Sequence, residues 1–114
     1  MTTQKLVICV SWNEALSKSR ELLLRSLGVT VVSGLYEREA RSVCQEDADL
    51  LVLGHSVPRD EKRRLIHAFR QHSNAPVLSL LRPEHDKLPE ATLGVEAAKP
   101  EEVLRVVRQL LRTG

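Results

Sequence analysis

The run LVICV at residues 6–10 and the run LLVL at residues 50–53 contain no charged residue. A strand that carries apolar side chains on both faces must be covered on both sides. Similar short runs recur along the chain and alternate with longer amphipathic stretches, which predicts a parallel sheet with helices on its faces. The predicted strands are Leu6–Val10, Val29–Val32, Leu50–Leu53, Val77–Leu81 and Leu93–Val95.

The amphipathic stretches between and after these strands have apolar residues at helical spacing. Ser11 or Asn13 would cap the first of them, and Gly28 would end it. Pro100 fits the first turn of the last one, where Glu101 and Glu102 lie at the positive end of the helix. The predicted helices are Asn13–Leu27, Tyr36–Gln45, Asp60–His72 and a last helix that begins at Pro100.

The segment RPEHDKLPEAT at residues 82–92 breaks the alternation of strands and helices. Pro83 and Pro89 bracket few residues with helical periodicity, so a helix of normal length is disfavoured there. A loop of this length is still long enough to connect two parallel strands. We therefore expect the fourth helix to be shortened or missing, and the sheet and helix flank beside it to expose apolar surface.

Length and composition exclude several classes of protein. The chain has 114 residues, 42% of them apolar, which fits a single domain over residues 1–114. It contains no apolar run long enough to span a membrane, and its start does not resemble a secretory signal, so we expect a cytoplasmic protein without a membrane partner. The two cysteines, Cys9 and Cys44, form neither a metal motif nor a disulfide framework.

The basic residues of the third predicted helix are the strongest candidates for a nucleic-acid contact. The formal net charge is only +2, and acidic residues dilute the basic stretch. We interpret the stretch as a solvated helix face and expect no nucleic-acid partner. Its basic residues are Arg59, Lys62, Arg63, Arg64 and Arg70, while Leu65, Ile66 and Phe69 are predicted to point inward.

The predicted order of strands and helices resembles the receiver domain of bacterial two-component response regulators. The segment DLLVL at residues 49–53, followed by GHSVP at residues 54–58, is similar to the third receiver strand and its loop. The phosphoacceptor position falls on Gly54 and the loop proline on Pro58, while Lys99 and Pro100 match the receiver Lys-Pro pair. The resemblance implies a flavodoxin-like three-layer α/β/α fold with a five-stranded parallel sheet in the order 2-1-3-4-5. Any site would lie at the carboxyl ends of strands one and three.

Departures from the receiver pattern remove the reaction that the resemblance implies. Ser11 and Trp12 stand where receivers have the acidic pair that holds Mg²⁺, and neither supplies a carboxylate. Gly54 has no side chain to accept a phosphoryl group. The hydroxyl and aromatic positions fall on Leu81 and Glu96. We therefore predict a pseudo-receiver without enzymatic activity, metal or cofactor, which acts as a phosphorylation-independent protein-interaction module in two-component (phosphorelay) signal transduction.

Several alternatives stay open at this point. Lys99 has lost its acidic neighbours, so its ammonium either reaches solvent or Glu96, or forms a site for an anionic metabolite together with Ser11. His55 or Ser56 would be the acceptor in an atypical phosphorylation, and an enzyme with an unrecognised site is a further possibility. The ring of Trp12 either closes the pocket or anchors a partner. The expected partner is a second copy in a homodimer, a histidine kinase or another response regulator, at the face that contains residues 82–92.

Overall fold

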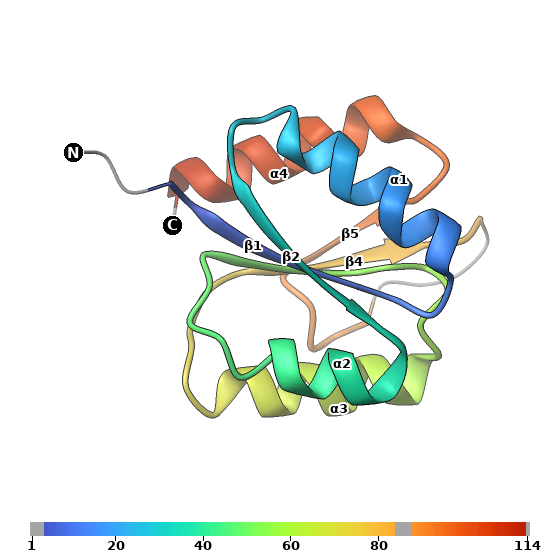
Figure 1. Cartoon of the computed structure of the whole chain (residues 1–114), viewed down its shortest axis with the longest axis vertical. Helices are drawn as coiled ribbons and strands as arrows, with labels where there is room; N and C mark the ends of the chain where they lie inside the picture. Colours follow the sequence, from blue (N-terminus) through green and yellow to red (C-terminus); the bar gives the residue numbers. More distant parts are fainter. Residues whose placement is uncertain (1–3, 84–87, 114) are drawn as a thin grey trace.

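The computed structural model describes residues 4–83 and 88–113 as three layers. A parallel sheet lies in the middle, with α1 (Glu14–Arg25) and α4 (Pro100–Thr113) on one face and α2 (Tyr36–Val43) and α3 (Arg59–Arg70) on the other (Figure 1). This confirms the predicted α/β class. None of the helices in the described part of the chain is both long and apolar enough to cross a membrane.

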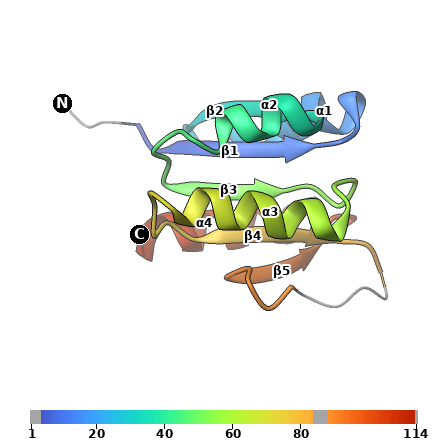
Figure 2. The ribbon, with the colours of Figure 1, turned by 90° about the horizontal axis from the view of Figure 1, so that it is seen from below.

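The sheet has five strands in the order β2-β1-β3-β4-β5, as predicted. All four pairings are parallel, and Figure 2 shows β1, β3, β4 and β5 side by side. The predicted second strand was too short, because Ser33 and Gly34 also pair with β1. An edge strand such as β2 needs fewer apolar residues than a central one. The strands are β1 (Leu6–Ser11), β2 (Thr30–Leu35), β3 (Leu50–Leu53), β4 (Val77–Leu81) and β5 (Leu93–Glu96).

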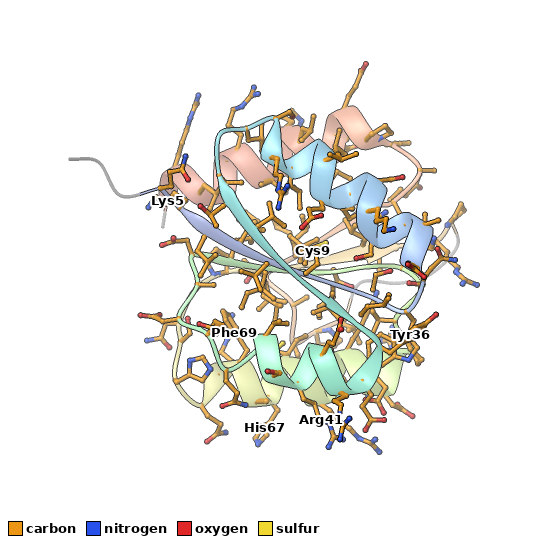
Figure 3. All side chains as sticks on the ribbon, in the orientation of Figure 1. Lys5, Cys9, Tyr36, Arg41, His67 and Phe69 are labelled. Atoms are coloured by element: carbon orange, nitrogen blue, oxygen red, sulfur yellow. The ribbon has the colours of Figure 1, made fainter. Side chains whose placement is uncertain are left out.

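The core is divided by the sheet into two clusters, because successive side chains of a strand point to opposite faces. Ile8 and Val10 of β1 pack toward α2 and α3, where Phe69 is fully buried. Val7 and Cys9 of the same strand pack toward α1 and α4. Figure 3 shows Cys9 and Phe69 on these opposite sides of the sheet. The unbroken apolar run of β1 is thus explained by burial on both faces.

Helix α1 begins at Glu14 because the side chain of Asn13 accepts a hydrogen bond from the Leu16 amide at 3.0 Å. It ends at Arg25, two residues before the predicted end. Residues 26–28 form a turn, in which Gly28 has a φ of 78°. The helix buries Arg20 along with Leu24, so its buried stripe is not purely apolar.

The connection between β4 and β5 contains no helix in its described residues, 82, 83 and 88–92, and residues 84–87 lie outside the described part. Only part of the apolar exposure expected beside it is found in the described residues. Leu88 and Ala91 are buried in the α2 and α3 core, and Glu90 forms an ion pair with Arg63 of α3 at 3.1 Å. Of the large apolar side chains described on this flank, Leu93 is exposed by 36%. The loop itself therefore replaces the packing of the missing helix.

Strand β2 passes into α2 without a loop, and Gly34 makes this close approach possible. Tyr36, the first residue of the helix, has a φ of 64°, which a bulky residue adopts only at a cost. A Cβ atom at Gly34 would lie 2.6 Å from Cγ2 of Val43 and 3.0 Å from the Cα atom of Ala40. The backbone of α2 therefore packs directly on β2 at this residue.

We predict that Gly34→Ala lowers the free energy of unfolding by about 2 kcal/mol, because the new methyl group overpacks the contact between α2 and β2. Urea denaturation of the two proteins measures the change. Val43→Ala removes the nearest side-chain atom, so the double variant should lose less stability than the sum of the two single changes. A Gly34→Ala protein as stable as the parent would contradict the close packing.

Candidate functional site

The carboxyl ends of β1 and β3 form the edge at which the sequence predicts a site. Val10 of β1 lies opposite Leu53 of β3. The amide of Gly54 donates a hydrogen bond to the Val10 carbonyl at 2.8 Å, which extends the pairing one residue beyond β3. The turn after β1 and the loop after β3 are therefore neighbours, as the resemblance implied.

Two serine hydroxyls hold these segments together. The Oγ atoms of Ser11 and Ser56 lie 3.0 Å apart, and the Trp12 amide donates to the Ser56 Oγ at 2.9 Å. The Ser11 hydroxyl also donates to the Asn13 carbonyl and accepts from the Asn13 amide. Ser11 is fully buried. At one of the two positions where receivers carry acids, this chain thus has a hydroxyl engaged in local hydrogen bonds.

Trp12 and Pro58 have structural contacts at the same edge. Trp12 is half-buried and packs against the core on the α2 and α3 side. This contact favours the interpretation that its ring closes the edge of the core rather than standing free. Pro58 caps α3 and accepts a hydrogen bond from the Lys62 amide at 2.9 Å through its carbonyl. It thereby sets the start of the helix that follows the loop.

Arg20 of α1 occupies the space around the phosphoacceptor position. A Cβ atom built on Gly54 would lie 3.1 Å from Nη1 of Arg20 and 2.9 Å from the Val10 carbonyl oxygen. The arginine is 8% exposed, and its Nη1 atom is buried without a hydrogen-bond partner. Burial lowers the pKa of its guanidinium from the ordinary value. A buried cation therefore lies beside Gly54, at the carboxyl ends of β1 and β3.

Sequence reasoning missed Arg20, although a signal was present. Position 20 lies four residues from both Leu16 and Leu24, and therefore falls on the apolar stripe of the helix. A charged residue on such a stripe either reaches solvent along the helix or is buried for a reason. The buried stripe was predicted from its leucines alone, so the burial of the arginine between them was not predicted.

The neighbouring titratable groups reflect this buried positive charge. Burial, followed by the charges of Arg20, Arg82 and Lys62, lowers the pKa of His55 from its ordinary value. The Nδ1 atom of His55 is buried and has no hydrogen-bond partner. Burial also raises the pKa of Cys9 to about 12, a rise that the charge of Arg20 opposes. The Cys9 thiol is thus protonated at neutral pH and inert.

Metal ligands do not gather at this edge. Within the described ranges, no group of three or more His, Cys, Asp or Glu residues is arranged to hold a metal ion. The side chains around Gly54 are a guanidinium and hydroxyls rather than the carboxylates that Mg²⁺ needs. The donor set therefore does not fit a magnesium ion.

Lys99 pairs with Glu96, whereas Ser11, its predicted partner in an anion site, makes its hydrogen bonds with Asn13 and Ser56. Its ammonium is 3.5 Å from a carboxylate oxygen of Glu96, and its side chain is 59% exposed. The Lys99 carbonyl accepts from the Val103 amide, so this residue, followed by Pro100, begins α4. The Lys99 ammonium therefore contacts Glu96 and solvent. This is one of the two alternatives that the sequence left open.

Lys62 corrects a prediction, because it is buried rather than on the solvated face of α3. Its Nζ atom donates to the Ser79 hydroxyl at 2.9 Å and to the Leu80 carbonyl at 2.8 Å, both in β4. Lys62 lies three residues before Leu65 and four before Ile66, so it falls on the buried stripe. Burial, followed by the charges of Arg59 and Arg82, lowers its pKa to about 8.

We predict that Lys62 makes stability depend on alkaline pH. The pKa of this ammonium is about 8 in the folded protein, against an ordinary value of 10.5, so the unfolded chain binds more protons between these two values. Lys62 therefore contributes a rise in the free energy of unfolding as pH increases from 8 to 10.5. Above pH 9.0 this rise is opposed by Cys9 and Cys44, because burial raises the pKa of both thiols from 9.0 to about 12. Lys62→Met should abolish this rise, whereas Lys18→Met, at an exposed position of α1, should retain it. Urea denaturation of both variants at both ends of the range measures the difference, because the thiols contribute equally to the two variants. An equal change of the free energy of unfolding in the two variants would contradict the assignment.

Comparisons with known proteins show similarity in structure only. The sequence matches no protein-family profile, and no curated protein is significantly similar to it. Three solved structures illustrate the similarity of fold. The signal receiver domain of an HD domain-containing protein from Pseudomonas fluorescens superposes with a TM-score of 0.82 at 17% identity, over 97% of each chain.

Two further solved structures show the same similarity of fold to this chain. The N-terminal domain of a response regulator/sensory box/GGDEF protein from Carboxydothermus hydrogenoformans gives a TM-score of 0.80 at 20% identity, covering 96% of this chain and 95% of that one. A putative response regulator from Chloroflexus aurantiacus gives 0.80 at 21% identity, covering 96% and 99%. Over nearly its whole length, the chain therefore has the fold of response regulator receiver domains.

Proposed function

We propose that this chain is a non-catalytic, phosphorylation-independent protein-interaction module of bacterial two-component signalling. The observation that carries the proposal is the contact between Arg20 and Gly54. The Arg20 Nη1 atom lies 3.1 Å from the point where the first side-chain atom of an acceptor residue would stand. Residue 54 therefore has neither an acceptor side chain nor the space for one.

The chemistry of phosphoryl transfer supports this proposal. The reaction needs a nucleophilic oxygen in line with the donor and a cation that neutralises the developing charge. Gly54 has no nucleophile, and the hydroxyls of Ser11 and Ser56 bond to each other and to the backbone. The buried guanidinium of Arg20 repels a divalent cation at the same place. The module would therefore signal through its surfaces in one constant state.

A different protein, rather than a second copy of the chain, is the partner that we propose. The sequence suggested a homodimer because a missing helix would leave apolar surface on the β4 and β5 flank. In the described residues, Leu88 and Ala91 fill this position from the loop. The argument for self-association thus loses its basis, and a histidine kinase or an authentic response regulator becomes the preferred partner.

We predict that the protein gains no mass when it is incubated with acetyl phosphate and Mg²⁺, as measured by intact mass spectrometry. A receiver domain with its acidic residues, treated in parallel, is the positive control. Gly54→Asp restores the acceptor alone and should also stay unmodified, because it lacks the metal ligands and faces Arg20. A phosphoryl group mapped to His55 or Ser56 in the parent protein would contradict the proposal.

We predict a monomer in sedimentation velocity experiments at micromolar concentration. The physical reason is the small apolar surface of the β4 and β5 flank, where Leu93 is exposed by only 36%. Leu93→Ser changes this side chain without touching the core and should leave the sedimentation coefficient unchanged. A dimer that this substitution dissociates would restore the hypothesis of self-association at the flank.

A further inference from the structure

A cavity opens beside Arg20, between α1, the end of β4 and the connection from β5 to α4. Its volume is about 410 Å³, within the range of sites for small ligands. Figure 1 shows the start of α1 and the β5–α4 connection at the same end of the molecule. Leu16, Leu81 and Ala97 contribute to its apolar lining, and its polar lining comes from Arg20, His55 and Arg82.

The polar lining of this cavity carries positive charge, and the described residues that line it include no acid to balance that charge. Among the described residues that line the cavity there is no carboxylate, and neither Arg20 nor Arg82 forms an ion pair within that part of the chain. Arg20 is more than nine-tenths buried, and among the described residues its Nη1 atom has no acceptor. A buried cation without a partner is destabilising, and an anion that reaches the accessible part of this guanidinium from the cavity would reduce that cost.

His55, the third polar residue of the lining, suits an anion that also has an uncharged part. Burial, followed by the charges of the nearby cations, lowers the pKa of His55 and favours its neutral form, and its buried Nδ1 atom has no hydrogen-bond partner among the described residues. A neutral imidazole offers one donor and one acceptor, so it can bond to a carboxylate, a phosphate or a hydroxyl group. The apolar side chains beside it cover a short carbon skeleton better than they cover a fully hydrated inorganic ion.

We infer that this cavity binds a small organic anion, with its carboxylate or phosphate group held by Arg20 and Arg82 and its apolar part against Leu16, Leu81 and Ala97. Planar guanidinium groups bind both kinds of anion through charge-assisted hydrogen bonds. The inference goes beyond the proposed function, because it adds a ligand to a module that is proposed to act through protein contacts. Its outcome is independent of the phosphorylation experiment, which measures a covalent change.

The test is a titration of the full chain, followed by ¹H–¹⁵N NMR at constant ionic strength. Benzoate, phenyl phosphate and inorganic phosphate are the anionic probes, and benzamide is the uncharged match of benzoate. We expect benzoate or phenyl phosphate to cause saturable shifts of the Arg20 Nε–H signal and of the His55 and Ala97 amides. Benzamide should cause none. Absence of saturable shifts with every anion, or equal binding of benzamide, would overturn the inference.

Two variants locate the binding charge. Arg82→Gln changes an exposed side chain, so it should preserve the fold and weaken benzoate or phenyl phosphate binding by about tenfold. Arg20→Met removes the buried charge and should abolish saturable binding while it raises the melting temperature of the free protein. Arg25→Met, on the exposed face of the same helix, is the control and should bind like the parent.

The stability measurement separates a binding role of Arg20 from a structural one. If the arginine only supported the packing of α1, Arg20→Met would lower the melting temperature and leave the affinity of the remaining folded protein unchanged. That pair of results would overturn the inference. Inorganic phosphate that binds as tightly as benzoate and phenyl phosphate would also overturn it, because the apolar lining would then contribute nothing to recognition.

Discussion

The parallel pairing of β1 with β3 places their carboxyl ends in direct contact, and the site depends on this constraint. The Gly54 amide bonds to the Val10 carbonyl at 2.8 Å, so the loop after β3 starts against the turn after β1. The Ser11 and Ser56 hydroxyls can then meet at 3.0 Å, although they are 45 residues apart in the chain. Because residue 54 has no side chain, Arg20 can reach this junction from α1. Strand pairing and an absent side chain together create the charged edge.

The charge at this edge has the opposite sign from that of a magnesium-binding cluster. An acid cluster attracts a divalent cation, whereas the positive charges of Arg20, Arg82 and Lys62 favour anions. Burial, followed by these charges, lowers the pKa of His55. A buried guanidinium without an acceptor among the described residues does not stabilise a fold by itself, since it loses hydration without gaining a hydrogen bond. The similarity of fold to receiver domains is therefore compatible with a different use of the same end of the sheet.

The connection between β4 and β5 shows how loop residues can supply packing where the described residues form no helix. Leu88 and Ala91 enter the core from the loop, and Arg63 of α3 pairs with Glu90. Lys62 extends from α3 to β4, where the Ser79 hydroxyl and the Leu80 carbonyl accept its hydrogen bonds. This contact satisfies the hydrogen-bonding capacity of two polar groups in β4, which the apolar pattern of the strand did not predict. Within the described residues, the loop and the buried ammonium of Lys62 cover this flank, and Leu93 stays exposed by 36%.

The sequence by itself determined the class of fold, and its resemblance to receiver domains implied the strand order. It also disfavoured a helix of normal length between β4 and β5, and none is found in the described residues of that connection. Unbroken apolar runs, helical periodicity and prolines are local signals, and they survive in one sequence without any relatives for comparison. It also showed that Gly54, Ser11 and Trp12 lack the chemistry of an acidic phosphoacceptor site. Only the tertiary structure placed Arg20 against Gly54 and Lys62 against Ser79, because burial of a long charged side chain depends on which distant segments surround it. Periodicity tells which side of a helix faces the core, but the partners on that side are assigned by the packing of the whole chain.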